Sequence, residues 1–175
     1  SYPHCWRTDK PILYYPLDSW FIKMTAVKEQ LIANNKKINW KPESTGTGRF
    51  GQWLENIQDW NLSRSRFWGI PLPIWADESK ETILCIGGKD DLFQHIETAN
   101  NSGVLTAQEV EANKQFVANF KAGTGDFHKP YIDNITLSAS GQKLKRELDV
   151  IDVWFDSGSM PYAQWNYPFS NQEKF

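Results

Sequence analysis

Trp154 stands in the run Val153-Trp154-Phe155-Asp156-Ser157-Gly158, which combines a large aromatic side chain with small polar groups. Proteins commonly build the wall of a small-molecule pocket from an apolar surface with a few polar groups at its rim. Trp154, Asp156 and Ser157 are therefore candidate substrate-binding residues, at the end of an expected strand. The alternative is a core tryptophan beside an Asp-Ser-Gly turn, and the residue types alone favour that alternative.

Arg64, Arg66 and Trp68 form a second candidate site. In an extended segment, residues two apart point to the same side, so both guanidinium groups could bind phosphate while Trp68 stacks on a base. This arrangement predicts an RNA contact. The alternative is an arginine pair held by carboxylates such as Asp59 or Glu55, and the sequence does not decide between the two.

No set of residues has the spacing of a catalytic centre. His4, His95 and His128 are single and scattered, so a surface or core role is the default for each. The sequence contains no Ser/His/Asp grouping, glycine-rich phosphate loop or pair of catalytic carboxylates. We therefore assign no catalytic residue and expect the chain to be inactive by itself.

The composition limits the classes of protein to consider. The formal charge of the 175 residues is −2, so no overall basic field indicates nucleic acid, and any RNA contact must be local. Nine tryptophans are many for this length and favour aromatic packing or a large interface. Cys5 and Cys85 lie far apart, which predicts reduced thiols and a cytoplasmic protein. No apolar run is long enough to predict a membrane span.

Four blocks of sequence resemble one family. They are DWNLSRSRFWGIPLPIW (residues 59–75), SYPHCWRTDKPILYY at the start, DVIDVWFDSGSMPYAQWNYPF near the end, and the weaker match FHKPYID. In their order along the chain, these blocks resemble isoleucyl-tRNA synthetases, which are class I aminoacyl-tRNA synthetases. The resemblance places the chain after the editing domain and before the KMSKS region. The expected chain is therefore a fragment of a longer enzyme.

The resemblance also implies a function for these residues. The tryptophan that matches Trp154 contacts the isoleucine side chain in the family, and the parent enzyme joins isoleucine to tRNA(Ile) using ATP and Mg²⁺. Neither the His-x-Gly-His signature nor the Lys-Met-Ser-Lys-Ser loop occurs here. We expect the fragment to contribute pocket wall and acceptor-end positioning, to bind no cofactor itself, and to contact the remaining synthetase domains. It is expected to be monomeric and not to associate with membranes.

The sequence departs from many relatives at the positions of their zinc ligands. Those relatives carry HCWRC and a Cys-x-x-Cys-Gly knuckle, whereas this chain reads HCWRT, with Thr8, and Leu-Ser-Ala-Ser-Gly at residues 137–141. Tetrahedral zinc needs four ligands, which His4 and Cys5 do not supply. We therefore expect no zinc site and no other metal site.

Hydrophobic periodicity predicts an α+β (mixed α/β) fold, part of a split synthetase nucleotide-binding body that carries a small α+β insertion. Body segments are expected at residues 1–76 and 148–175, with the insertion at residues 77–147. Expected helices cover residues 24–35, 50–57, 90–99 and a segment after a Thr106–Glu109 capping box. Expected strands cover residues 12–15, 20–22, 81–86, 132–137 and 144–153, with a β-turn at Ser140-Gly141 and a flexible turn at residues 43–48.

Three other interpretations remain open from the sequence. The chain could be an independent RNA-binding module, a scaffold without catalytic function, or part of a synthetase with valine specificity. A tRNA titration would test the first, and a tryptophan-rich exposed patch would favour the second.

Overall fold

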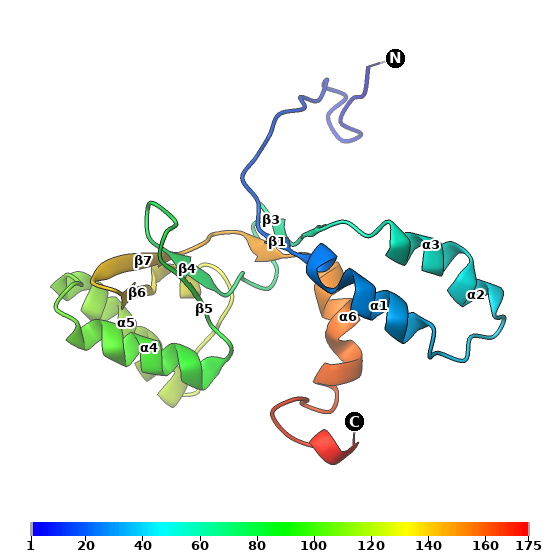
Figure 1. The fold of residues 1–175 in the computed structure, drawn as a ribbon. Coiled ribbons are helices and arrows are strands. Elements are labelled where there is room, and N and C mark those ends of the chain that lie inside the picture. Colours follow the sequence, from blue (N-terminus) through cyan, green and yellow to red (C-terminus); the bar gives the residue numbers. More distant parts are fainter. Residues whose placement is uncertain (1, 175) are drawn as a thin grey trace. The chain divides into compact units, whose positions relative to one another are not determined.

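The computed structural model describes residues 2–174 and combines helices with short strands, which confirms the α+β class (Figure 1). The chain divides into two compact units, Ser1–Asn61 and Leu62–Phe175. The three-part division at residues 1–76, 77–147 and 148–175 stays a prediction.

The first unit is a set of short helices closed by a two-stranded sheet. Its elements are β1 (Phe21–Ile22), η1 (Met24–Val27), α1 (Lys28–Asn35), α2 (Ser44–Thr47), α3 (Arg49–Glu55) and β2 (Trp60–Asn61). β1 pairs antiparallel with β2, with Phe21 opposite Asn61. The N–H and hydroxyl of Thr25 donate to the Asp59 carboxylate at 3.0 and 2.8 Å. These bonds, the backbone one first, lower the pKa of Asp59.

Two predictions for this unit are wrong. Residues 12–15 form no strand, because the N–H of Ile12 bonds within the terminal loop, to Pro3 O, and no neighbouring strand pairs with this segment among residues 2–174. Residues 43–48 are not a flexible turn but contain α2. This helix is fixed by Asn35, which donates to Gly46 O at 2.9 Å and accepts from the Trp40 indole N–H at 2.9 Å.

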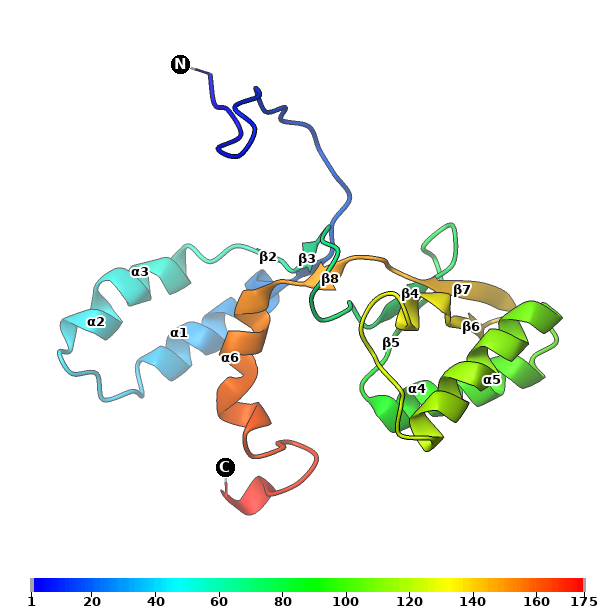
Figure 2. The same cartoon turned by 180° about the vertical axis from the view of Figure 1, so that it is seen from behind.

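The second unit contains the larger sheet. Its elements are β3 (Ser63–Arg64), β4 (Ile74–Ala76), β5 (Ile83–Cys85), α4 (Lys89–Asn101), α5 (Ala107–Lys121), η2 (Ile132–Asn134), β6 (Thr136–Ala139), β7 (Gln142–Arg146), β8 (Val150–Ile151), α6 (Val153–Ala163) and η3 (Gln172–Lys174). An antiparallel sheet has the order β5-β4-β7-β6, and β3 pairs separately with β8. Figure 2 shows β3 and β8 side by side.

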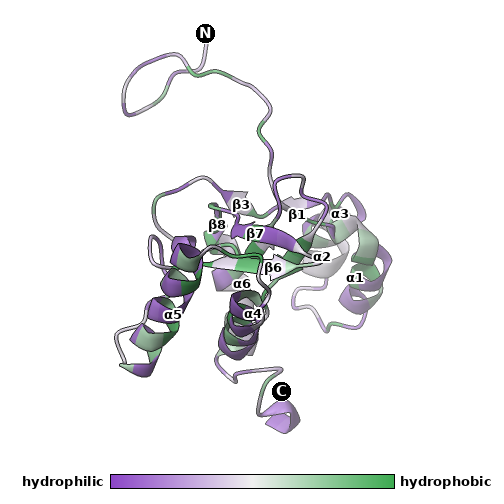
Figure 3. Ribbon diagram, turned by 90° about the vertical axis from the view of Figure 1, so that its left-hand side faces the viewer, coloured by the Kyte–Doolittle hydropathy of each residue, from purple (hydrophilic) through white to green (hydrophobic). Residues whose placement is uncertain are grey.

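The core of this unit lies between the four-stranded sheet and helices α4 and α5. Trp75, Leu137 and Leu144 are almost fully buried in it, and the Trp75 indole N–H donates to Ile135 O at 3.0 Å. Purple and green alternate along both helices in Figure 3, as expected for helices with one apolar face. The hydrophobic effect of this buried face therefore holds the helices on the sheet.

Asn113 joins α5 to the edge strand β6. Its side chain is fully buried, donates to Thr136 O at 2.8 Å and accepts from Thr136 N–H at 3.2 Å. The amide therefore bonds both main-chain groups of an edge residue, as a neighbouring strand would.

Local signals in this unit gave correct predictions. The capping box of Thr106 and Glu109 begins α5, and β6 and β7 form the expected hairpin. Ser140 and Gly141 both have positive φ, 51° and 76°, as a two-residue hairpin turn of type I′ requires.

The predicted bounds of two longer strands in this unit, at residues 132–137 and 144–153, are wrong. Residues 132–134 form η2, and the expected strand 144–153 is split into β7 and β8 and followed by α6. The fully buried guanidinium of Arg146 explains the split, because it donates to the carbonyls of Leu72 and Asp149 at 3.2 Å and draws the chain out of the sheet. The same group is neutralised by Asp133.

We predict that Glu109 makes the stability of this unit depend on pH. Its bonds with Lys143 and then with the Thr106 N–H lower its pKa from 4.5 to about 2. Because the folded-state pKa is depressed, the stabilisation is present above pH 4.5 and is lost as the pH falls towards 2. The difference in unfolding free energy between the wild type and Glu109→Gln, measured by hydrogen exchange of α5 amides, should shrink over this range. A difference that is constant with pH would contradict the prediction.

Candidate functional site

The candidate site is organised by the carboxylate of Asp152, which immediately precedes α6. One of its oxygens accepts the Trp154 main-chain N–H at 3.0 Å, which makes Asp152 the N-cap of the helix. Its other oxygen accepts from the Arg64 guanidinium. The Asp152 side chain is only 7% exposed and that of Arg64 is 37% exposed. A buried carboxylate is thus paired with a charge at the protein surface.

The strands β3 and β8 hold these two residues in register. Ser63 lies opposite Ile151, and Arg64 lies opposite Val150. The Asp152 N–H donates to Leu62 O at 2.8 Å, and a second guanidinium nitrogen of Arg64 donates to Ser63 O at 2.8 Å. The backbone ladder and the ion pair therefore act on the same two segments.

Trp154 lies in the first turn of α6, not at the end of a strand as predicted. Its side chain is 72% exposed, and α6 has no buried residue. The core-tryptophan alternative does not describe it in this structure. Asp156 and Ser157 follow in the same helix, where Asp156 is half-buried and Ser157 is exposed.

Arg64 and the other two residues of the second candidate site, Arg66 and Trp68, have different surroundings. Arg64 is joined to Trp154 through Asp152, whereas Arg66, Phe67 and Trp68 are exposed in the loop after β3. The Trp68 ring stacks on the His128 ring with centroids 4.6 Å apart and an angle of 10° between the planes. An exposed arginine therefore precedes an exposed aromatic stack.

His128 is itself oriented by Asp126. The Asp126 carboxylate accepts a hydrogen bond from the His128 main-chain N–H at 2.8 Å, and the same oxygen lies 2.8 Å from His128 Nδ1. These contacts, the backbone one first, lower the pKa of Asp126. Sequence reasoning missed His128, because its partner Trp68 is distant in the chain. It also missed Asp152, because residues 144–153 were expected to form a strand and an aspartate is an N-cap signal only where a helix follows.

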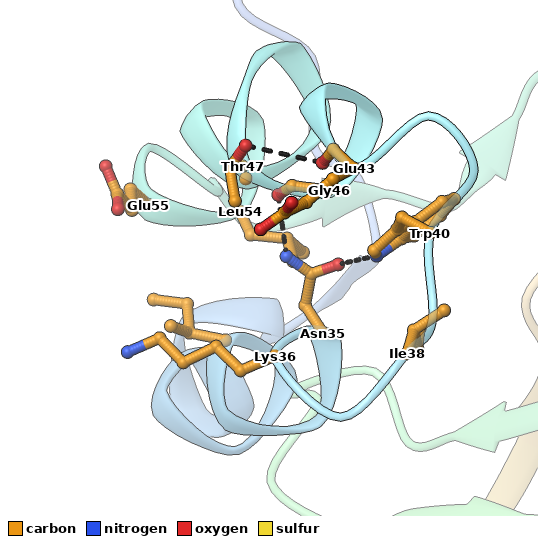
Figure 4. Close-up of a pocket in the computed structure, with 11 residues that line it drawn as sticks. Asn35, Lys36, Ile38, Trp40, Glu43, Gly46, Thr47, Leu54 and Glu55 are labelled. Atoms are coloured by element: carbon orange, nitrogen blue, oxygen red, sulfur yellow. Dashed lines mark hydrogen bonds between the residues drawn. The ribbon is translucent and has the colours of Figure 1, made fainter.

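A hollow of about 290 Å³ lies in the first unit, between α1, α2 and α3. Figure 4 shows Asn35 at its centre, bonded to Gly46 and Trp40. Every buried side-chain nitrogen or oxygen in residues 2–174 has a hydrogen-bond partner, so the hollow offers no unsatisfied polar group to a ligand. It reflects the packing of three short helices.

Within the part of the chain that the structure describes, no three His, Cys, Asp or Glu residues are grouped so as to hold a metal ion. The described helices include none that is long and apolar enough to cross a bilayer.

Comparison with known proteins identifies the class. Residues 8–175 match the family of class I tRNA synthetases (I, L, M and V), and the chain belongs to this family. Its relatives include isoleucine–tRNA ligases from several bacteria, which confirms the resemblance. The chain is 61% identical to that of Cytophaga hutchinsonii over its whole length, 60% identical to that of Porphyromonas gingivalis over 99% of its length, and 46% identical to that of Clostridium novyi over its whole length. It spans only 15–16% of the length of these ligases.

Proposed function

We propose that the chain acts as part of an isoleucine–tRNA ligase, which joins isoleucine to tRNA(Ile) in the cytoplasm with ATP and Mg²⁺. Its role is to supply one wall of the amino-acid pocket through Trp154, Asp156 and Ser157. The observation that carries the proposal is the exposed indole of Trp154 at the fixed start of α6. The similarity to isoleucine–tRNA ligases supports it. ATP and Mg²⁺ would be held by other parts of the ligase.

The physical properties of α6 suit a pocket wall. A helix with apolar side chains on all sides is normally buried, yet Val153, Trp154 and Met160 are exposed here. The rest of the ligase would cover part of this surface and leave the indole facing the substrate. An apolar pocket of this kind distinguishes one methylene by only about 1–3 kcal/mol, which is why such an enzyme benefits from separate editing.

We also propose that Arg64, Arg66 and Trp68 position the acceptor end of tRNA. Arg66 and Trp68 are both exposed and lie two positions apart in sequence, and the stacked Trp68–His128 pair presents a flat aromatic surface. Exposed guanidinium groups bind phosphate, and aromatic rings stack on bases. Arg64 would contribute mainly by supporting this loop, because it is paired with Asp152.

The pocket role predicts that Trp154→Ala in the full-length ligase raises the KM for isoleucine by roughly 10- to 100-fold, because a buried aromatic contact with the substrate is lost. The KM for ATP should change little. ATP–pyrophosphate exchange measures both constants. Trp68→Ala serves as the matched control and should leave the isoleucine KM unchanged. An unchanged KM for isoleucine in Trp154→Ala would remove the pocket assignment.

The RNA role predicts that Arg66→Ala weakens tRNA binding and makes it less dependent on salt. The magnitude of the negative slope of log K for tRNA binding against log salt concentration should fall by about 1, as expected for one lost phosphate contact. Anisotropy titration of the full-length ligase at several salt concentrations measures the slope. Lys114→Ala removes an equal charge from the exposed part of α5 and should leave the slope unchanged. Equal slopes for the wild type and Arg66→Ala would exclude the contact.

The chain by itself is expected to show no ATP–pyrophosphate exchange with isoleucine, because it contains neither nucleotide-binding signature of the class. Exchange by the purified chain above a heat-treated sample would contradict this expectation.

A further inference from the structure

We propose that Asp152 is a positioning residue for amino-acid recognition: through Arg64 and the first turn of α6, it sets the place of the Trp154 indole. This inference rests on the proposed function, because it concerns how the pocket wall is held. It assigns a role to a residue outside the proposed pocket wall, and it connects Arg64 to the start of the helix that carries Trp154.

Asp152 uses separate atoms for separate contacts. Its carboxylate accepts the Trp154 N–H at 3.0 Å with one oxygen and the Arg64 guanidinium with the other. Its main-chain N–H donates to Leu62 O, and its main-chain carbonyl accepts from Phe155 N–H, both at 2.8 Å. The residue two positions before Trp154 is therefore fixed on both its side-chain and main-chain atoms.

The ion pair determines which way the carboxylate faces. A carboxylate that is 7% exposed is costly unless a charge and hydrogen bonds compensate it. Arg64 supplies the charge, and its contact with Ser63 O at 2.8 Å holds the guanidinium plane against β3. The β3–β8 pairing thus positions Arg64, Arg64 orients the Asp152 carboxylate, and Asp152 fixes the start of α6.

No residue of α6 is buried, and its start follows directly on the Asp152 cap and on strand β8, which pairs with β3. An error of about 1 Å in the position of a group that contacts substrate can cost up to about 100-fold in rate. The Asp152–Arg64 pair should therefore affect isoleucine recognition more than its distance from the substrate suggests.

Substitutions at these two residues separate the cap from the ion pair. Asp152→Ala removes both. Asp152→Asn keeps a good N-cap acceptor but loses the charge, and Arg64→Lys keeps the charge but loses the planar fork. Asp133→Asn is the matched control, since it breaks the other buried Asp–Arg pair of this unit, with Arg146, away from α6.

The experiment measures ATP–pyrophosphate exchange by the full-length ligase with isoleucine and with valine. Asp152→Ala should raise the KM for isoleucine roughly 10-fold, with a smaller change in kcat, and should reduce the preference for isoleucine over valine. Asp152→Asn and Arg64→Lys should show smaller effects in the same direction. Asp133→Asn should lower the melting temperature without changing either KM.

A double-mutant cycle provides the decisive comparison. If Asp152 acts through the indole, Asp152→Ala should add little to the loss of kcat/KM already caused by Trp154→Ala. Independent, multiplying losses would overturn the proposal, as would an unchanged isoleucine KM in Asp152→Asn and Arg64→Lys. If Asp152→Ala does not fold, these two milder variants decide the question.

The results also separate this inference from the proposed function. An effect of Trp154→Ala without any effect of the Asp152 and Arg64 variants would overturn only the positioning role. No effect of Trp154→Ala on the isoleucine KM would overturn both.

Discussion

A carboxylate that is withdrawn from water must be neutralised, and this requirement at Asp152 governs how β3, β8 and α6 are joined in the second unit. Its partner Arg64 lies 88 residues away in the chain, so the pair joins two sequence blocks that are separated by the four-stranded sheet and helices α4 and α5. Losing one member of such a pair is worse than losing both, because the remaining charge stays desolvated.

Features that depend on neighbouring residues could be predicted from the sequence. The start of α5 follows from the reciprocal bonds of Thr106 and Glu109, and the hairpin follows from Ser140-Gly141, where a positive φ is easily adopted. The resemblance of four sequence blocks gave the family correctly, because those blocks retain its residue pattern over most of the chain.

Features decided by distant partners could not be predicted. The β-branched residues Val150, Ile151 and Val153 are typical of a strand, but β8 ends at Ile151 because the Asp152 cap turns the chain into a helix. The alternatives for Arg64 likewise depended on a carboxylate far along the sequence. The ligands proposed for Trp154 and Arg66 could not be derived either, since the chain spans only 15–16% of the length of the isoleucine–tRNA ligases it matches.

The buried Asn113 amide has a consequence for self-association. By bonding both the N–H and the carbonyl of Thr136, it occupies positions on β6 that an incoming strand would need. The sheet ends on its other side at β5, where Ile83 and Cys85 are exposed. A strand from another molecule would therefore add to the sheet at β5 rather than at β6. A charged side chain introduced at Ile83 is the substitution best placed to prevent aggregation of the protein by this route.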